Sequence, residues 1–130
     1  MDAHVLIVDD NPINIKLASD VLEAAGYRVK CVTCADEVFA ALETQTPQLL
    51  LVDIGLPDTD GLTLTRMLRT DTRYSGLPIV AFTAAAMKGD RERALKAGCN
   101  GYITKPISTR DFAAQVRSYF RSADGDPEAT

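Results

Sequence analysis

Several apolar runs of this sequence end at residues whose side chains could do chemistry. These residues are Asp9 and Asp10, Asp53, Thr83 and Lys105. Three carboxylates in one place repel one another unless a cation compensates, and an all-oxygen ligand set suits Mg²⁺ better than zinc. A lysine ammonium and a threonine hydroxyl can hold the oxygens of a phosphoryl group. If they meet, these groups favour phosphoryl transfer, with one carboxylate as the nucleophile.

Each of these residues taken singly has a more ordinary explanation. An acid that follows a strand is usually a turn former or a helix cap. A lone threonine such as Thr83 is most often a surface or capping hydroxyl, and a lysine before a proline, such as Lys105, is most often a solvated charge. Only their joint placement at the ends of successive strands is specific, so the elements that position them decide the interpretation.

A strand followed by a helix recurs five times along the chain. We expect strands at residues 4–8, 27–32, 49–52, 77–83 and 101–104, and helices at 13–25, 37–43, 62–69, 87–97 and 108–120. Asn11 and Pro12 are typical of a helix start, and Gly26 and Gly98 of helix ends. The run 49–52 is apolar throughout, which is typical of a central parallel strand covered on both faces.

Alternating strands and helices predict a doubly wound α/β fold, with a parallel sheet, right-handed crossovers and helices on both faces. In such sheets, sites form beyond the carboxyl ends of the strands. We therefore expect the polar residues above to share one crevice, with Asp53 on the central strand as the nucleophile. At 130 residues the chain is expected to form one domain over residues 1–121, followed by a flexible tail at 122–130.

Composition excludes several classes of protein. A net charge of −4 argues against direct binding of nucleic acid, which needs a basic face. No apolar stretch approaches the length of about 20 residues that spans a membrane, and no secretory signal begins the chain. Three cysteines, an odd number, predict free thiols in a reducing compartment. We expect a cytoplasmic protein that contacts no membrane.

The sequence resembles the response-regulator receiver family, to which the flavodoxin-like protein CheY belongs. The stretches that carry the resemblance are residues 5–10, 51–54, Leu56-Pro57 with Gly61, 82–84 and Lys105-Pro106. They extend over nearly the whole chain. Segments 86–90, 98–99 and 105–108 are similar to single-domain receivers of the DivK type and to the receivers of hybrid histidine kinases. The resemblance implies a five-stranded parallel sheet of strand order 2-1-3-4-5 with five helices.

The resemblance also implies a chemistry for the carboxylates. Asp53 would become an aspartyl phosphate in a reaction that needs Mg²⁺ or Mn²⁺. Asp10 and Asp53 would ligate the metal directly, Asp9 would act through water, and Gly55 would contribute its backbone carbonyl. The chain would then be no conventional enzyme, but would catalyse its own phosphotransfer and autodephosphorylation.

The resemblance further implies a switch. Lys105 would pair with the phosphoryl oxygens, Thr83 would move to hydrogen-bond one of them, and Tyr102 would swing inward in the same transition. These changes would alter the face formed by the fourth helix, fifth strand and fifth helix, and so control protein partners. Tyr102 could instead be an ordinary core aromatic, since one aromatic in a strand usually is.

The phosphodonor must come from another protein. The single histidine, His4, begins the first strand, away from the carboxyl ends. We expect a histidine kinase or a histidine phosphotransfer protein as donor, a downstream protein as target, no DNA-binding output domain, and a monomer or weak dimer. Gly55 and Ala85 stand where many relatives carry larger side chains that hinder water, so a short-lived phosphoaspartate is expected.

Three alternatives stay open at the level of sequence. The chain could be a binding module that works without phosphorylation. It could be a thiol redox protein, because Cys31 and Cys34 form a C-x-x-C pattern. A phosphatase for small substrates would use similar chemistry, but would need a second aspartate just beyond the nucleophile, where Ile54 and Gly55 stand.

Overall fold

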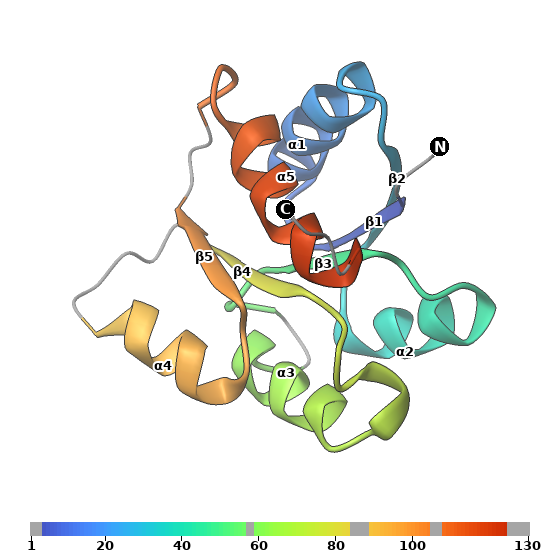
Figure 1. Cartoon of the computed structure of the whole chain (residues 1–130), viewed down its shortest axis with the longest axis vertical. Helices are drawn as coiled ribbons and strands as arrows, with labels where there is room; N and C mark the ends of the chain where they lie inside the picture. The colour runs from blue at the N-terminus through green and yellow to red at the C-terminus, as the bar shows by residue number, and fades with distance from the viewer. Residues whose placement is uncertain (1–3, 57–58, 84–88, 105–107, 125–130) are drawn as a thin grey trace.

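The predicted alternation of strands and helices is present along the chain (Figure 1). The computed structural model describes residues 4–56, 59–83, 89–104 and 108–124, with side chains up to residue 120. The elements are β1 (His4–Val8), α1 (Pro12–Ala24), β2 (Arg28–Val32), α2 (Ala35–Thr44), β3 (Leu49–Val52), α3 (Gly61–Arg69), the short 3-10 helix η1 (Thr72–Tyr74), β4 (Ile79–Thr83), α4 (Asp90–Ala97), β5 (Gly101–Thr104) and α5 (Phe112–Asp124).

All five strands form one parallel sheet in the order β2-β1-β3-β4-β5. This order confirms the doubly wound fold and makes β3 the central strand. Its four residues, Leu49–Val52, are all buried, as a strand covered on both faces requires. β2 and β5 are the two edges of the sheet.

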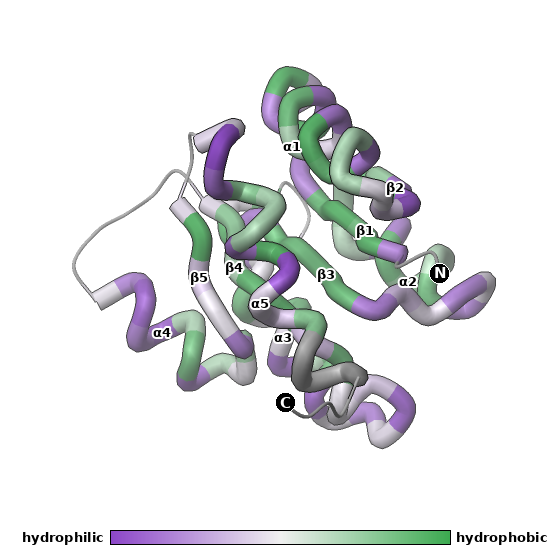
Figure 2. Tube along the Cα trace, turned by 45° about the horizontal axis from the view of Figure 1, so that its top comes forward, coloured by the Kyte–Doolittle hydropathy of each residue, from purple (hydrophilic) through white to green (hydrophobic). Residues whose placement is uncertain are grey.

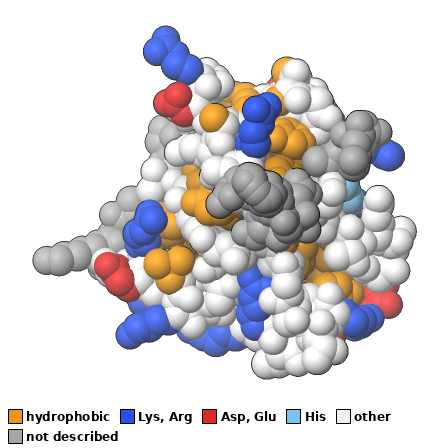
Figure 3. Space-filling model, viewed as in Figure 1, with side chains coloured by type: hydrophobic (Ala, Val, Ile, Leu, Met, Phe, Trp, Pro, Cys, Tyr) orange, Lys and Arg blue, Asp and Glu red, His pale blue; other side chains and the backbone are white. Residues whose placement is uncertain are grey.

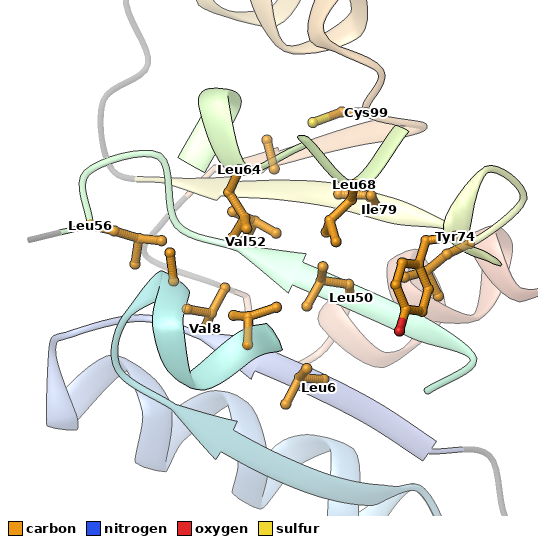
Figure 4. Close-up of a cluster of buried hydrophobic side chains, with 14 of the residues drawn as sticks. Leu6, Val8, Leu50, Val52, Leu56, Leu64, Leu68, Tyr74, Ile79 and Cys99 are labelled. Atoms are coloured by element: carbon orange, nitrogen blue, oxygen red, sulfur yellow. The ribbon is translucent and has the colours of Figure 1, made fainter. Parts of the chain in front are cut away.

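Helices cover both faces of the sheet, with α1 and α5 on one side and α2, α3 and α4 on the other (Figure 1). Alternate residues of the strands feed two separate hydrophobic clusters. Leu6 and Leu50 belong to the cluster on the α2–α3–α4 side, drawn in Figure 4, whereas Val5 and Leu49 belong to the cluster on the α1–α5 side. Figure 2 accordingly shows β1 and β3 as hydrophobic over most of their length, whereas hydrophobic and hydrophilic residues alternate along the helices.

The local signals at helix ends are confirmed. The Asn11 side chain accepts hydrogen bonds from the backbone N–H groups of Ile13 and Asn14, and Pro12 is the first helical residue. Gly26 and Gly98 have φ angles of 100° and 113°, which are left-handed conformations that glycine adopts without strain. Within the described residues, no helix is both long and apolar enough to cross a membrane.

Some element boundaries differ from the predictions. Tyr27 precedes β2 because its N–H donates to the carbonyl of Leu22 at 3.0 Å, at the end of α1. Its ring stacks on Phe120, at 5.1 Å between centroids. β4 begins at Ile79, since the N–H of Leu77 closes the η1 turn onto the carbonyl of Tyr74. α2 starts at Ala35 instead of residue 37.

The start of α4 and the end of α5 lie next to residues that the structure does not describe. The predicted start of the fourth helix at residue 87 lies outside the described residues, and the described α4 begins at Asp90. α5 continues to Asp124, beyond the predicted domain boundary at residue 121. Of the predicted tail, residues 125–130 lie outside the described part of the chain, so its flexibility stays a prediction.

Candidate functional site

The end of β1 supplies two acidic residues with opposite exposure. Asp9 is completely buried, and its N–H donates to the carbonyl of Val32 at 3.1 Å, which continues the pairing of β1 with β2. One oxygen of its carboxylate accepts a hydrogen bond of 2.9 Å from the N–H of Asn11. Asp10, the next residue, is exposed. β1 therefore anchors one carboxylate in the protein and presents the other to solvent.

Asp53 follows the last residue of the central strand. Its N–H donates to the carbonyl of Val8 at 2.9 Å, so the pairing of β3 with β1 extends to the acidic residue itself. The N–H of Gly55 donates to the Asp53 carboxylate at 3.2 Å, and only 8% of the residue is exposed. The backbone of the sheet thus fixes where this carboxylate lies.

The three carboxylates meet, as the topology predicted. One oxygen atom from each of Asp9, Asp10 and Asp53 lies within 4.8 Å of the other two. Like charges at such separations repel strongly, and more so where two of them are buried, because water screens them less. A cluster of hard oxygen donors is the ligand set that Mg²⁺ and Mn²⁺ prefer. The residues present therefore fit a hard divalent cation.

Thr83 ends β4 at the same edge of the sheet. It is 3% exposed, and the strand register pairs it with Thr104 of β5. In the β3–β4 register Val52 pairs with Ala81, so Thr83 lies just beyond the level of Asp53. Lys105 follows Thr104 directly but lies outside the described residues, so its approach to the carboxylates stays a prediction.

Tyr102 lies on the edge strand β5 and is only partly buried. Its ring packs against the margin of the cluster on the α2–α3–α4 side. Burial, and then the charge of Asp90, raise the pKa of the Tyr102 hydroxyl. The residue is therefore no fully enclosed core aromatic, and its part in a switch stays a prediction.

Sequence reasoning did not predict that Asp90, the first residue of α4, is buried. This aspartate is 4% exposed and forms an ion pair with Arg93 one turn later. In the sequence it looks like an ordinary acid in the first turn of a helix, where it complements the helix dipole. Gly89 before it has a φ of 92°, a left-handed conformation that suits glycine.

The C-x-x-C pair lacks the character of a redox site. Cys31 and Cys34 are both half-buried free thiols. Burial raises the pKa of the Cys31 thiol, and the nearby charge of Glu23 raises it further. A redox-active dithiol needs a thiol whose pKa is depressed. The structure thus gives no support to the thiol redox alternative.

Basic side chains are dispersed over the surface shown in Figure 3, with acidic and apolar groups between them. A nucleic-acid interface requires a continuous basic patch that tracks the phosphate backbone. The described residues on that face form no such patch. The exclusion of nucleic acid as a direct partner stays a prediction.

Curated relatives match nearly the whole chain. The polar-differentiation response regulator DivK of Brucella ovis is 41% identical over 123 residues, which cover 95% of this chain and all of that protein. The protein of the same name from Brucella anthropi matches with the same identity and coverage.

Solved structures and a family match agree with these relatives. The receiver domain of the sensor histidine kinase PA1611 of Pseudomonas aeruginosa, solved with a magnesium ion in its active site cleft, is 33% identical with a TM-score of 0.83, over 92% of this chain and 98% of that one. A CheY-like receiver domain protein of Methanospirillum hungatei has a TM-score of 0.86 at 28% identity, covering 97% and 100%. Residues 5–117 match the response regulator receiver domain family. The chain therefore belongs to the response regulator receiver family of two-component signalling.

Proposed function

We propose that Asp53 accepts a phosphoryl group from the phosphohistidine of a partner protein. The observation that carries this proposal is the meeting of three carboxylates at the carboxyl edge of the sheet, with Asp53 on its central strand. A carboxylate oxygen of Asp53 attacks phosphorus, a P–O bond forms, and the P–N bond to histidine breaks. The imidazole leaves with the electron pair and takes up a proton. Membership of the receiver family implies a histidine kinase as donor, directly or through a phosphotransfer protein.

The acidic cluster would hold Mg²⁺ or Mn²⁺ during this reaction. Asp10 and Asp53 would be direct ligands, Asp9 would act through water, and Gly55 would offer its backbone carbonyl. The magnesium-bound receiver of PA1611 supports this assignment by its likeness to the chain. A bound divalent cation neutralises negative charge on the transferring group and on the carboxylates.

Lys105 and Thr83 would bind the phosphoryl oxygens of phosphorylated Asp53, and Tyr102 would respond to the movement of Thr83. Phosphorylation adds about −1.5 to −2 charges at neutral pH, and coupling energies between sites are typically about 1–3 kcal/mol. Such a bias is sufficient to shift the α4–β5–α5 face between two arrangements that partners distinguish. The charges of Asp90 and Arg93 both act on the Tyr102 hydroxyl, which supports a link between Tyr102 and the start of α4.

The switch can be tested without knowing the partner. Tyr102→Ala should leave phosphorylation intact but remove the phosphorylation-dependent change in hydrogen exchange over α4 and β5. Tyr102→Phe, which keeps the ring, is the matched variant. If Tyr102→Ala and wild type show the same change, Tyr102 does not take part in the switch.

The central claim is tested by intact-mass measurement after incubation with acetyl phosphate and Mg²⁺. Wild type should gain one phosphoryl group. Asp53→Asn, and wild type in the presence of EDTA, should gain none. An absent adduct in wild type, even after rapid quenching, would favour the alternative of a binding module that works without phosphorylation.

We expect a short lifetime of the aspartyl phosphate, because the space beside Gly55, two residues beyond Asp53, is open. Gly55 is exposed, and a Cβ built on it would meet no atom within 4 Å. Residue 55 therefore places no side chain in the way of a water molecule that attacks phosphorus and releases inorganic phosphate and the free carboxylate. Ala85, the second small residue invoked, lies outside the described residues. Gly55→Arg and Ala85→Tyr should each slow dephosphorylation of the purified protein, and unchanged lifetimes in both would contradict the idea.

The remaining parts of the proposal concern the location of the protein in the cell, its target and its oligomeric state. Free half-buried thiols support a reducing, cytoplasmic location. The target would be another protein, and the chain would act as a monomer or weak dimer. Size-exclusion chromatography with light scattering, before and after phosphorylation, distinguishes these two states.

A further inference from the structure

The first residue of α3 lies directly against the backbone of the proposed phosphoacceptor. Gly61 is buried, and its N–H donates to the carbonyl of Ile54 at 2.9 Å. A Cβ built on Gly61 would overlap the carbonyl oxygen of Asp53. It would also lie 2.8 Å from Cγ1 of Val52 and 2.9 Å from Cα of Ile54. The missing side chain therefore makes room for residues 52–54.

The reason for glycine here is space and not backbone conformation. The glycines with positive φ among the described residues are Gly26, Gly89 and Gly98, and Gly61 is not one of them. Alanine is otherwise the residue most favourable to a helix. Two of the three atoms in the way, at Asp53 and Ile54, belong to the backbone, which cannot rotate aside as a flexible side chain could.

The start of α3 is fixed by local hydrogen bonds and by packing in the core. The hydroxyl of Thr65, a fully buried residue, donates to the carbonyl of Gly61 at 2.9 Å. The Asp60 side chain caps the helix by accepting from the N–H of Leu62 at 2.8 Å. Leu62 and Leu64 are buried in the core. Because the helix start is fixed, a side chain at residue 61 would displace the backbone of residues 53–54.

Displacement there would act on the carboxylate cluster. The Asp53 carboxylate lies within 4.8 Å of those of Asp9 and Asp10, and is held by the N–H of Gly55. Metal and catalytic groups function only when held to within about 0.5 Å of their productive geometry. A shift of Asp53 by a fraction of a methyl radius would thus disturb both metal binding and attack on phosphorus.

We propose that Gly61 is a positioning residue for phosphoryl acceptance: its lack of a side chain sets the place of the Asp53 backbone, and through it the alignment of the Asp53 carboxylate with Asp9 and Asp10. This inference rests on the proposed function of Asp53. It assigns Gly61 no contact with metal or phosphate. Its effect is transmitted entirely through the main chain of residues 53–54.

The test compares Gly61→Ala with two matched variants. Gly76→Ala adds the same methyl group where a Cβ would meet nothing within 4 Å. Thr65→Val removes the hydrogen bond to the carbonyl of Gly61, and so weakens the start of α3 without filling the space at residue 61. Mg²⁺ affinity is measured by calorimetry, and the initial rate with acetyl phosphate at saturating Mg²⁺ by intact mass. All measurements are made at low temperature with a stabilising osmolyte, where far-UV circular dichroism must match wild type.

Gly61→Ala is expected to bind Mg²⁺ at least about tenfold more weakly and to accept phosphate at least about tenfold more slowly, since small misplacements cost up to about 100-fold in rate. Gly76→Ala and Thr65→Val should match wild type in both. Wild-type values in Gly61→Ala, an equal loss in Thr65→Val, or a Gly61→Ala chain that stays unfolded would each overturn the inference. If wild type itself neither bound Mg²⁺ nor accepted phosphate, the failure would lie with the proposed function.

Discussion

The two ends of the same sheet solve opposite electrostatic problems. At the carboxyl ends of the strands, the carboxylates of Asp9, Asp10 and Asp53 lie within 4.8 Å of one another. At the amino end, one guanidinium is surrounded by oxygen acceptors. Arg69 donates from Nε to the carbonyl of Gly98 at 2.9 Å and from Nη1 to the carbonyl of Tyr74 at 2.9 Å.

A single amide extends the network at the amino end. Nη2 of Arg69 donates to Oδ1 of Asn100 at 2.8 Å, and the same oxygen accepts from the N–H of Ile79 at 2.8 Å. The N–H of Asn100 in turn donates to the carbonyl of Ile79 at 2.6 Å. Gly98 lies so close that a Cβ on it would be 2.7 Å from Cγ of Arg69. The network joins α3, the start of β4 and the turn between α4 and β5.

The difference shows how the chain divides stability from function. A cluster of like charges that destabilises the fold is typical of a functional site. A planar cation whose donors meet carbonyls and an amide is typical of a structural clamp. Substitutions at the amino end should therefore change stability with little effect on phosphorylation, and substitutions at the carboxyl end should do the reverse.

Arg69→Met should give the largest loss of stability. It leaves the carbonyls of Gly98 and Tyr74 without this donor, and Oδ1 of Asn100 with the N–H of Ile79 alone. The expected cost is about 2–4 kcal/mol in the free energy of unfolding. Urea denaturation measures the loss. Arg69→Lys keeps the charge but not the planar guanidinium, so its free energy of unfolding should lie between those of wild type and Arg69→Met. Phosphorylation by acetyl phosphate at low temperature should be unchanged. A large drop in its rate would break the proposed division.

Mg²⁺ should stabilise the carboxyl end selectively. At a concentration of about 10 to 30 times its Kd, the free energy of unfolding of wild type should rise by about 1–2 kcal/mol. Asp53→Asn should show no such rise, whereas Arg69→Met should retain it. In EDTA, Asp53→Asn should be at least as stable as wild type, because one of three like charges is gone. A less stable Asp53→Asn would mean that this carboxylate has a structural role as well.

Asn100 offers a smaller test of the amino end. Asn100→Ala removes the acceptor shared by Arg69 and Ile79 and should cost about 1 kcal/mol in the free energy of unfolding. Asn100→Asp keeps an oxygen in the same place and adds a favourable charge beside Arg69, so its stability should be close to that of wild type. Equal losses in the two variants would show that the shared acceptor contributes nothing.

The smallest effect concerns the pH dependence of the amino end. Burial lowers the pKa of His4, at the start of β1, and the charges of Arg28 and Lys30 lower it further. As the pH falls, the unfolded chain therefore binds a proton at His4 before the folded chain does. The contribution of neutral His4 to folding stability is fully present above the unfolded pKa of about 6.5, and it is lost as the pH falls from there through the folded pKa. The urea midpoint of wild type should fall between pH 7.5 and pH 5.5 by more than that of His4→Gln. Equal falls would exclude His4 as a cause.

Much of the fold was predictable because its signals are local. The continuous apolar run Leu49–Val52 marked the central strand, and Asn11 with Pro12 marked the start of α1. Boundaries failed where a turn before the strand takes up backbone groups of the expected first residues. The N–H of Tyr27 closes the end of α1 onto the carbonyl of Leu22, and its ring stacks on Phe120, a residue of the last helix that no local pattern connects with it.

The candidate site was predictable to the same extent and for the same reason. Parallel strands bring their carboxyl ends to one edge, so the meeting of Asp9, Asp10 and Asp53 follows from topology. The close contacts of Gly61 and Arg69 do not follow from topology. In the sequence, Gly61 is one position of a motif and Arg69 a basic residue in the last turn of a helix. The contacts that give them meaning depend on where the chain places residues far along it.

The strand order also bears on how the protein avoids association through its sheet. β2 is an edge, with backbone groups open to pairing by another chain. Arg28 and Lys30 are exposed along it. A second copy that paired with this edge in parallel register would set each of these charges beside its equivalent, and an antiparallel pair centred on Lys30 would oppose two ammonium groups. The sequence that builds the edge of the sheet thus also protects it against aggregation.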